Sequence, residues 1–367
     1  MLPFLRADLA KLKAYQPHPP ILDPYDQLDT NESPIDLPAE VKADLANHYQ
    51  HIIKANRYPD GGHTALKQAI ANYVSQSATG TTAENISVGN GSDELIRSLL
   101  IATAIGNGSI LVASPTFSMY GILAQTLGIP VIDVGRRDNF CINLEKAQTT
   151  VEQQDIRAVF MVHPNSPTAN PLSAAEIEWL RQLPENMLIV IDEAYFEFSG
   201  QTLVADSLKR TNWVVLRTFS KAFRLAAHRV GYAVAQPELI EALEKVRLPY
   251  SLPSFSQAAA LTALAHRTSL LTMVEDSIAE RHQMATWLSE QSMITTWPSA
   301  ANFIYCRLSK KGLTRFGMDQ AEGLHHVFSS LRQHGTLIRY TGGGLRISLG
   351  TPEENQRTRT NLQAILS

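Results

Sequence analysis

The chain has 367 residues, a hydrophobic fraction of 44% and a formal net charge of −3 at pH 7. This length is too great for one small core and favours two domains. The charge offers no basic field for nucleic acid, and no apolar run approaches the ~20 residues that span a bilayer. The two cysteines, Cys141 and Cys306, are too far apart in the sequence for a compact disulfide framework, so we expect a reduced, cytoplasmic protein.

The chain begins with an arm, residues 1–30, which lacks the apolar block of a signal peptide and ends in extended loop and turns. Residues 31–248 then alternate helical patterns with short apolar runs, which predict strands buried on both faces of a sheet. These runs are "NISVGN", "SILVASP", "PVIDVG", "AVFMVHPN", "MLIVIDEAY", "WVVLRTF" and "VGYAVA". The alternation predicts an α/β fold, in which a large domain contains a doubly wound, mostly parallel sheet.

The pattern changes in residues 249–367. A long helical pattern that begins "PSFSQAAALTALAHRTSLL" is followed by the run "NFIYCRL", the helical "QAEGLHHVFSSLRQHG" and the run "LRISLG". This order predicts a second, smaller α+β domain, joined to the first through "RLPYSLPS". We expect the N-terminal arm, residues 1–30, to pack with this small domain.

Polar residues follow several of the predicted strands, where doubly wound sheets place their ligand sites. The first group is "VGNGSDELIRSLL", in which Gly89 and Gly91 permit a tight turn and Ser92 suits a helix N-cap. With Asp93 and Glu94 in the first turn, this segment predicts either a capped helix or an anion site for a phosphate. The dinucleotide-binding fingerprint is not met, because Glu94 stands where its third glycine belongs.

Three further strand ends carry groups that a packed core does not need. Phe117 in "ASPTFSMYG" can stack on a flat ligand or belong to the core, and the loop "HPNSPTANP" offers hydrogen bonds from Asn165, Ser166 and Thr168. Asp192 follows the apolar run "MLIVI" and should lie deep at the end of its strand. A carboxylate there needs a partner or takes up a proton, so the alternatives are a helix cap, a structural salt bridge or a ligand contact.

The segment "TFSKAFRLAAHRVGY" places Lys221 after a predicted strand and Arg229 eight residues later. A partly desolvated lysine near other cations has a lowered pKa and can form a Schiff base with an aldehyde. One cofactor, pyridoxal phosphate, uses every group above. Its aldehyde matches Lys221, its ring nitrogen Asp192, its phosphate the helix N-terminus and Arg229, and its ring face Phe117. Asn165 or Tyr195 would then face its phenolic oxygen.

At this point the chain resembles the fold-type I pyridoxal-phosphate aminotransferases and, more narrowly, the histidinol-phosphate aminotransferases. The resemblance runs nearly end to end, through "LDTNESP", "NRYPDGG", "GNGSDE", "PTFSMY", "PNSPT", "DEAYFEF", "TFSKAFRLAAHRVGY" and "GTLIRYTGGGLRISLGT". It implies a homodimer with active sites near the subunit interface. The implied reaction is a ping-pong amino transfer from L-histidinol phosphate to 2-oxoglutarate, giving imidazole acetol phosphate and L-glutamate.

The resemblance also implies residue roles. Lys221 becomes the Schiff-base lysine and the proton carrier between the substrate Cα and the cofactor's C4′. Asp192 becomes the partner of the pyridine nitrogen and Tyr195 a donor to the phenolic oxygen. The groups implied to hold the cofactor phosphate are Ser220, Arg229 and the backbone around Ser92 and Asp93, with Tyr58 reaching it from the neighbouring subunit. Thr218 is a further expected cofactor-binding residue.

For the substrate, the resemblance implies that Arg346 grips the acidic end and that Arg339 is its companion for the substrate phosphate. Two arginines suit a dianionic phosphate and can also hold a carboxylate, although surface salt bridges are the alternative. Asn31 and Tyr15 match positions that close over the substrate.

Two departures from the family pattern stand out. The family often reads Asn-Asn-Pro-Thr-Gly where this chain has "NSPTA", so Ser166 occupies the slot of the asparagine that bonds the phenolic oxygen. Either Ser166 or Asn165 takes that role, and we favour Asn165. Phe117 replaces the usual stacking tyrosine, which keeps the ring contact and loses a hydroxyl.

Other functions stay open at this stage. The same scaffold suits an aromatic or other amino-acid aminotransferase and a phosphothreonine-type decarboxylase. A nicotinamide-dependent dehydrogenase fits the sheet but not the failed glycine pattern, and a non-catalytic binding protein has no use for a buried lysine beside a carboxylate. We expect no metal site, because His48, His51, His325 and His326 lack further ligands at the usual spacing.

Overall fold

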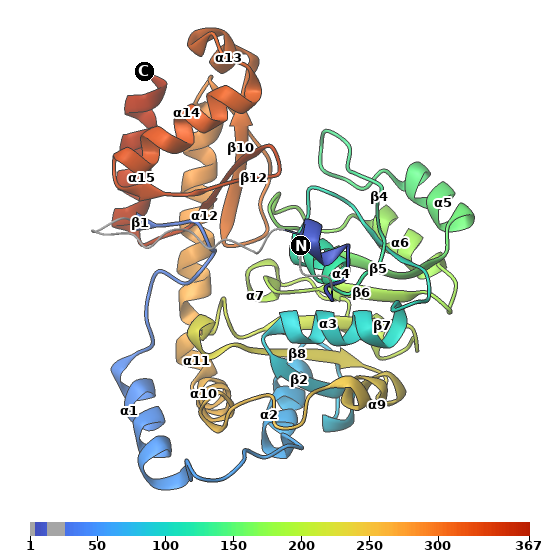
Figure 1. Cartoon of the computed structure of the whole chain (residues 1–367). Coiled ribbons are helices and arrows are strands. Elements are labelled where there is room, and N and C mark those ends of the chain that lie inside the picture. The colour runs from blue at the N-terminus through green and yellow to red at the C-terminus, as the bar shows by residue number, and fades with distance from the viewer. Residues whose placement is uncertain (1–3, 13–25) are drawn as a thin grey trace.

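The computed structural model describes residues 4–12 and 26–367. A seven-stranded sheet forms the centre of its larger part (Figure 1). Its strand order is β2 (Ile86–Asn90), β8 (Val230–Ala235), β7 (Trp213–Thr218), β6 (Leu188–Asp192), β5 (Ile156–Val162), β3 (Ser109–Val112) and β4 (Val131–Asp133). Six of the strands lie within six of the apolar runs, and β5 begins two residues before the run "AVFMVHPN". Only β8 runs antiparallel to its neighbours, so the predicted α/β fold with a mostly parallel sheet is confirmed.

Two apolar layers enclose this sheet, because successive side chains of a strand point to opposite faces. In β6, Leu188 and Val190 pack in the layer under α3 (Ser92–Thr103), α4 (Met119–Thr126) and α9 (Pro237–Val246). Ile189 and Ile191 pack in the opposite layer. The helices of that layer are α1 (Ala39–Asn47), α2 (Thr64–Val74), α5 (Leu144–Gln153), α6 (Ala174–Gln182), α8 (Val204–Ser207) and α10 (Ser254–Ala265).

The C-terminal part builds a separate antiparallel sheet in the order β12 (Arg339–Thr341), β13 (Gly344–Ser348), β10 (Phe303–Leu308) and β9 (Ile294–Thr296). Its apolar core packs against α12 (Thr272–Glu290), α13 (Lys310–Phe316), α14 (Gln320–Gln333) and α15 (Pro352–Leu366). The long helix α12 runs from beside α10 and α11 (Arg267–Leu270) to this sheet (Figure 1). The end of the N-terminal arm joins the same part, since β1 (Asp26–Gln27) pairs with β11 (Thr336–Leu337).

The remaining described elements are short: α7 (Phe196–Ser199), the 3-10 helices η1 (Leu9–Lys11), η3 (Ala83–Asn85) and η4 (Ala226–His228), and a π-helical turn, η2 (His48–Ile52). Among the described residues, no helix has both the length and the apolarity of a membrane span.

The division into an arm (1–30), a large domain (31–248) and a small domain (249–367) stays a prediction. Core packing favours a later boundary between the last two, because Leu252, Ala259 and Leu270 belong to the apolar layer of the seven-stranded sheet. Leu28, by contrast, packs in the C-terminal core. The segment that follows β1 therefore approaches the large sheet from the C-terminal part of the chain.

Candidate active site

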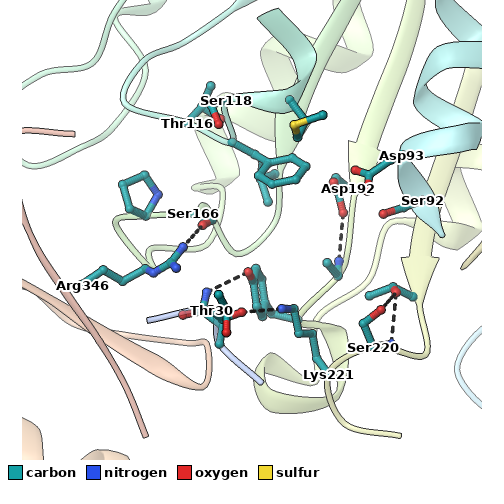
Figure 2. A pocket seen from close by; sticks show the side chains of 18 of the residues that line it. Thr30, Ser92, Asp93, Thr116, Ser118, Ser166, Asp192, Ser220, Lys221 and Arg346 are labelled. Atoms are coloured by element: carbon teal, nitrogen blue, oxygen red, sulfur yellow. Dashed lines mark hydrogen bonds between the residues drawn. The ribbon is translucent and has the colours of Figure 1, made fainter. Parts of the chain in front are cut away.

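A cavity of about 470 Å³ opens at the carboxyl ends of the parallel strands, as expected for a doubly wound sheet. The loops and helix starts that follow strands of the large sheet supply most of its wall, and the C-terminal sheet and the segment after β1 supply the rest (Figure 2). Its lining residues are Asp29, Thr30, Asn31, Ser92, Asp93, Thr116, Phe117, Ser118, Met119, Val162, Ser166, Pro167, Asp192, Ala194, Tyr195, Thr218, Ser220, Lys221, Arg229, Arg339, Thr341 and Arg346.

Lys221 lies in this wall just after β7. Its Nζ donates a hydrogen bond of 2.7 Å to the carbonyl oxygen of Thr30 (Figure 2). Burial, followed by the positive charge of Arg346, lowers the pKa of Lys221 to about 8. A sizeable fraction of this amine is therefore neutral and nucleophilic near pH 8, which is unusual for a lysine.

Asp192 ends β6, and its side chain is 3% exposed. Because side chains two positions apart in a strand point to the same face, the Asp192 carboxylate lies on the face of Leu188 and Val190, which α3 and α4 cover. Burial raises the pKa of Asp192 to about 6, although hydrogen bonds from the Tyr120 hydroxyl (2.7 Å) and the Ala194 amide (3.1 Å) oppose this shift. The carboxylate thus meets the cavity with a pKa near neutrality.

The N-terminus of α3 lies at one end of the cavity, where Ser92 and Asp93 line the wall. Gly91 is the N-cap, and no side chain caps the helix. This corrects one expectation, because Ser92 is the first helical residue and not the cap. A side chain at Gly231 in β8 would place its Cβ 2.5 Å from the Ser92 amide nitrogen. Glycine at that position therefore lets the strand approach the helix start, where uncapped N–H groups attract an anion.

Arg229 supplies a full positive charge at the same end. Its guanidinium lies 3.1 Å from the carboxylate of Asp93 and 3.3 Å from the hydroxyl of Ser220. The Ser220 amide in turn donates to the Thr218 hydroxyl at 3.1 Å. Hydroxyl, guanidinium and helix N–H groups are the usual donors to a phosphate.

Arg346 in β13 defines the opposite end of the cavity. One of its Nη atoms donates to the Ser166 hydroxyl at 3.2 Å, and the other donates to the carbonyl of Asp29. Asn31 donates from its Nδ2 to the Tyr195 hydroxyl at 2.9 Å. Figure 2 shows Arg346 and Ser166 on the side of the cavity away from Ser92 and Asp93. A guanidinium therefore stands at each end of the site, that of Arg229 paired with Asp93, with an amine and a carboxylate between them.

Comparison with known proteins identifies the family. The family model of class I and II aminotransferases matches residues 26–362. The chain belongs to the class I and II aminotransferases. It is 57% identical to histidinol-phosphate aminotransferase 2 of Nostoc sp. over 381 aligned residues, covering 100% of this chain and 98% of that protein. It is 54% identical to histidinol-phosphate aminotransferase of Trichodesmium erythraeum, with both chains covered at 100%.

A solved structure has the same fold as this aminotransferase. The crystal structure of histidinol-phosphate aminotransferase from Sinorhizobium meliloti, in complex with pyridoxal-5'-phosphate, superposes with a TM-score of 0.85. It covers 100% of this chain and 98% of its own, at 22% sequence identity. The likeness confirms the fold-type I architecture.

Most of the site residues that the sequence predicts line this cavity: Asn31, Ser92, Asp93, Phe117, Ser166, Asp192, Tyr195, Thr218, Ser220, Lys221, Arg229, Arg339 and Arg346. Tyr15 lies outside the described residues. Tyr58 is 82% exposed, stacks on Tyr250 at a ring distance of 4.7 Å and does not line the cavity of its own subunit.

Asn165, which we favoured for the phenolic oxygen, does not line the cavity. Its amide donates to the Pro115 carbonyl and the Thr168 hydroxyl, while its Oδ1 accepts from Thr116 and Arg136. These four hydrogen bonds, three of them to residues outside its own loop, hold the side chain away from the cavity. The geometry therefore favours the other alternative, Ser166.

Sequence reasoning missed two contributors. The carbonyl of Thr30 is a backbone group, so no side-chain motif could identify it as the partner of Lys221. Tyr120, whose ring is fully buried, stands in the first turn of α4, three positions after Phe117. Its place in the segment "PTFSMY", next to a predicted cavity residue, was the available signal. Among the described residues, no cluster of three or more His, Cys, Asp or Glu side chains could hold a metal ion.

Proposed function

We propose that this aminotransferase uses pyridoxal 5'-phosphate to transfer the amino group of L-histidinol phosphate to 2-oxoglutarate, giving imidazole acetol phosphate and L-glutamate. One observation carries the proposal: Lys221, whose pKa is about 8, lines the same cavity as the buried carboxylate of Asp192. The full-length identity of 50% or more to five histidinol-phosphate aminotransferases supports the choice of substrate. The reaction belongs to histidine biosynthesis.

The donor set fits this cofactor. The uncapped start of α3, Ser220 and Arg229 would match its phosphate, Asp192 its ring nitrogen, and Phe117, which lines the cavity, would offer an aromatic face to its ring. When bound, the cofactor supplies an aldehyde for amines and a protonated ring that withdraws electrons from the substrate Cα. With its pKa near 6, Asp192 is largely ionised at pH 7 to 8 and stabilises a proton on that ring nitrogen.

Lys221 is proposed to hold the cofactor's aldehyde carbon and, once released, to move the proton between the substrate Cα and C4′. Its lowered pKa suits both tasks, because a general base works best with a pKa near the operating pH. Tyr195 and Ser166 are proposed to donate to the phenolic oxygen, and burial keeps the Tyr195 hydroxyl protonated by raising its pKa.

Arg346 and Arg339 are proposed to bind the acidic end of the substrate, with Asn31 placed beside them. A guanidinium pairs with two oxygens of a phosphate or a carboxylate alike, so the same pair serves the phosphorylated amine and glutamate in turn. This dual use is what a ping-pong reaction in one cavity requires.

We propose further that two copies form a homodimer in which Tyr58 reaches the phosphate site of the partner. The basis is a set of exposed apolar side chains, Tyr49, Ile52, Tyr58, Leu248 and Tyr250, whose exposed fractions range from 48% to 82%. The rings of Tyr58 and Tyr250 stack on each other at 4.7 Å, and large exposed apolar patches mark interaction surfaces. Mixing Tyr58→Ala with Lys221→Ala subunits should restore activity, because each hybrid dimer then contains one intact site. Mixed subunits that stay inactive while dimeric would contradict this assignment of Tyr58.

The activity itself is tested with Lys221→Ala. This variant should lose turnover with L-histidinol phosphate by several orders of magnitude, and borohydride reduction should no longer fix the cofactor covalently to the protein. Lys245→Ala is a matched control, since Lys245 is an exposed helix residue paired with Glu241. Full turnover in Lys221→Ala would defeat the proposal. Faster turnover with phenylalanine, or release of carbon dioxide, would identify one of the alternative reactions.

Two further assignments, of the domains and of the cellular location, complete the proposal. We retain a large and a small domain with the N-terminal arm attached to the latter, as β1 pairs with β11. We also propose a cytoplasmic location, where the two free thiols, Cys141 and Cys306, stay reduced.

A further inference from the structure

The side chains of Tyr120 and Asp192 are hydrogen-bonded to each other at the wall of the cavity. The Tyr120 hydroxyl donates to Oδ2 of Asp192 at 2.7 Å, and the Ala194 amide donates to Oδ1 at 3.1 Å. Tyr120 is fully buried and lies outside the cavity wall, whereas Asp192 lines it. Each carboxylate oxygen therefore has one partner from the protein and keeps a lone pair for a ligand.

The fold explains why these two residues meet. Asp192 points to the face of β6 that α4 covers, and Tyr120 stands in the first turn of α4. The ring of Tyr120 also meets the ring of Phe117 edge-on, with centroids 5.5 Å apart. The carboxylate and the aromatic ring in the cavity wall are thus held by one buried side chain.

The surroundings of Asp192 disfavour its charge. Burial raises its pKa, and the carboxylates of Asp93 and Glu193 raise it further. The Tyr120 hydrogen bond is the largest effect in the opposite direction. Burial also raises the pKa of Tyr120 well above its usual value, so its hydroxyl stays protonated and remains a donor.

We propose that Tyr120 is a positioning residue that keeps the carboxylate of Asp192 ionised and oriented toward the ring nitrogen of the cofactor. This inference rests on the proposed function and deepens it. Without the hydroxyl, Asp192 is more basic and can rotate about its side-chain bonds. The shared proton then shifts from the ring nitrogen toward the carboxylate, and the ring withdraws electrons less strongly.

The test is Tyr120→Phe in the full-length holoenzyme, which removes the hydroxyl and keeps the ring contacts with Phe117 and Phe160. Tyr73→Phe is the matched control, because the buried Tyr73 hydroxyl donates to the Glu197 carboxylate at 3.0 Å away from the cavity. Both variants lose one tyrosine-to-carboxylate hydrogen bond, so a general loss of stability affects both.

Two measurements separate positioning from stability. With cofactor labelled at the ring nitrogen, the nitrogen-15 signal of Tyr120→Phe should move toward the unprotonated form, and that of Tyr73→Phe should stay at the wild-type position. The cofactor dissociation constant and kcat of Tyr120→Phe should each worsen by about tenfold, the factor that corresponds to one pKa unit, with KM nearly unchanged. In an Asp192→Asn background, Tyr120→Phe should have almost no further effect on cofactor affinity.

A folded Tyr120→Phe enzyme with the wild-type nitrogen-15 signal and cofactor affinity would overturn this inference, and so would an undiminished effect in the Asp192→Asn background. If Tyr120→Phe does not fold, difluorotyrosine at position 120 gives the same test with the opposite sign, because a more acidic hydroxyl should increase ring protonation. Failure of the wild-type protein to bind pyridoxal phosphate would instead reject the proposed function.

Discussion

The Nζ atom of Lys221 lies 2.7 Å from the carbonyl oxygen of Thr30, a residue 191 positions earlier in the chain. The segment that carries Thr30 is tied to the C-terminal sheet, because Leu28 exchanges backbone hydrogen bonds with Leu337 and Ser348. A neutral amine can donate to this carbonyl and keep its lone pair for another atom. The contact therefore orients the amine without taking away its nucleophilicity, and it makes the C-terminal part of the chain a component of the site.

The first prediction concerns the pH dependence of cofactor attachment. Because the neutral amine is the nucleophile, the rate at which apoenzyme binds pyridoxal phosphate covalently should rise with pH and level off above about 8, the pKa of Lys221. A lysine of ordinary pKa would give a rate that still rises toward pH ~10. Stopped-flow absorbance of the bound cofactor measures this rate. A rate that keeps rising above pH 9 would contradict the lowered pKa.

A second prediction tests the close approach of β8 to the start of α3. Gly231→Ala places a Cβ 2.5 Å from the Ser92 nitrogen and 2.7 Å from the Gly91 carbonyl carbon, so strand and helix must separate. We expect the affinity for the cofactor phosphate to fall by about tenfold or more, because the helix N–H groups lose their position. Isothermal titration with pyridoxal phosphate measures the change.

Gly121→Ala is the control for that substitution. Gly121 lies inside α4, and no heavy atom stands within 4 Å of a Cβ built there. Alanine favours the helix by up to ~1 kcal/mol over glycine, so this variant should bind the cofactor normally and unfold at the same or a higher temperature. Equal cofactor affinity in both variants would refute the role of the close approach.

The third prediction separates Ser166 from Asn165. Asn165→Ala removes four hydrogen bonds of a buried amide, and we expect a loss of unfolding free energy of about 2 to 4 kcal/mol. Ser166→Ala leaves that network intact but removes the hydroxyl that accepts from Arg346, so it should change the visible spectrum and raise KM with little effect on stability. Thermal unfolding and steady-state kinetics distinguish them. The opposite pattern would restore Asn165 as the residue at the phenolic oxygen.

The fourth prediction is a pH dependence of stability that arises outside the cavity. His63 is 0% exposed, neither ring nitrogen has a hydrogen-bond partner, and burial lowers its pKa to about 4. The unfolded chain binds a proton at this residue below pH ~6.5, whereas the folded chain does so only near pH 4, so stability falls as the pH drops through this window. The loss amounts to about 3 kcal/mol for this one group.

His63→Asn removes the titrating group and suits the positive backbone angle at this position, where φ is 53°. Urea unfolding of both proteins at pH 7 and at pH ~4.5 should show a smaller loss of stability in the variant. Identical losses in the two proteins would contradict the low pKa of His63.

Several elements could be predicted from the chain because their causes are local. Each of the seven apolar runs became a strand, since a continuous run such as "MLIVID" can be buried on both faces of a sheet. The helix after "VGNGS" begins within one residue of the expected position, and its acidic first turn is present. The expected division at residue 248 is less well supported, because the place where α10 packs depends on surfaces far away in the sequence.

In the site itself, the amino-acid order determined which chemical groups the chain offers: an amine, a carboxylate, three arginines and a helix that starts after a glycine-containing turn. Residue types and short spacings carry that information directly. Only the tertiary structure decided which groups share the cavity. It turned Asn165 inward and left Ser166 in the wall, aimed Tyr120 at Asp192 and brought the carbonyl of Thr30 to Lys221. The reason is that the packing of distant segments decides which side chains face the cavity, and a local sequence pattern contains no information on that packing.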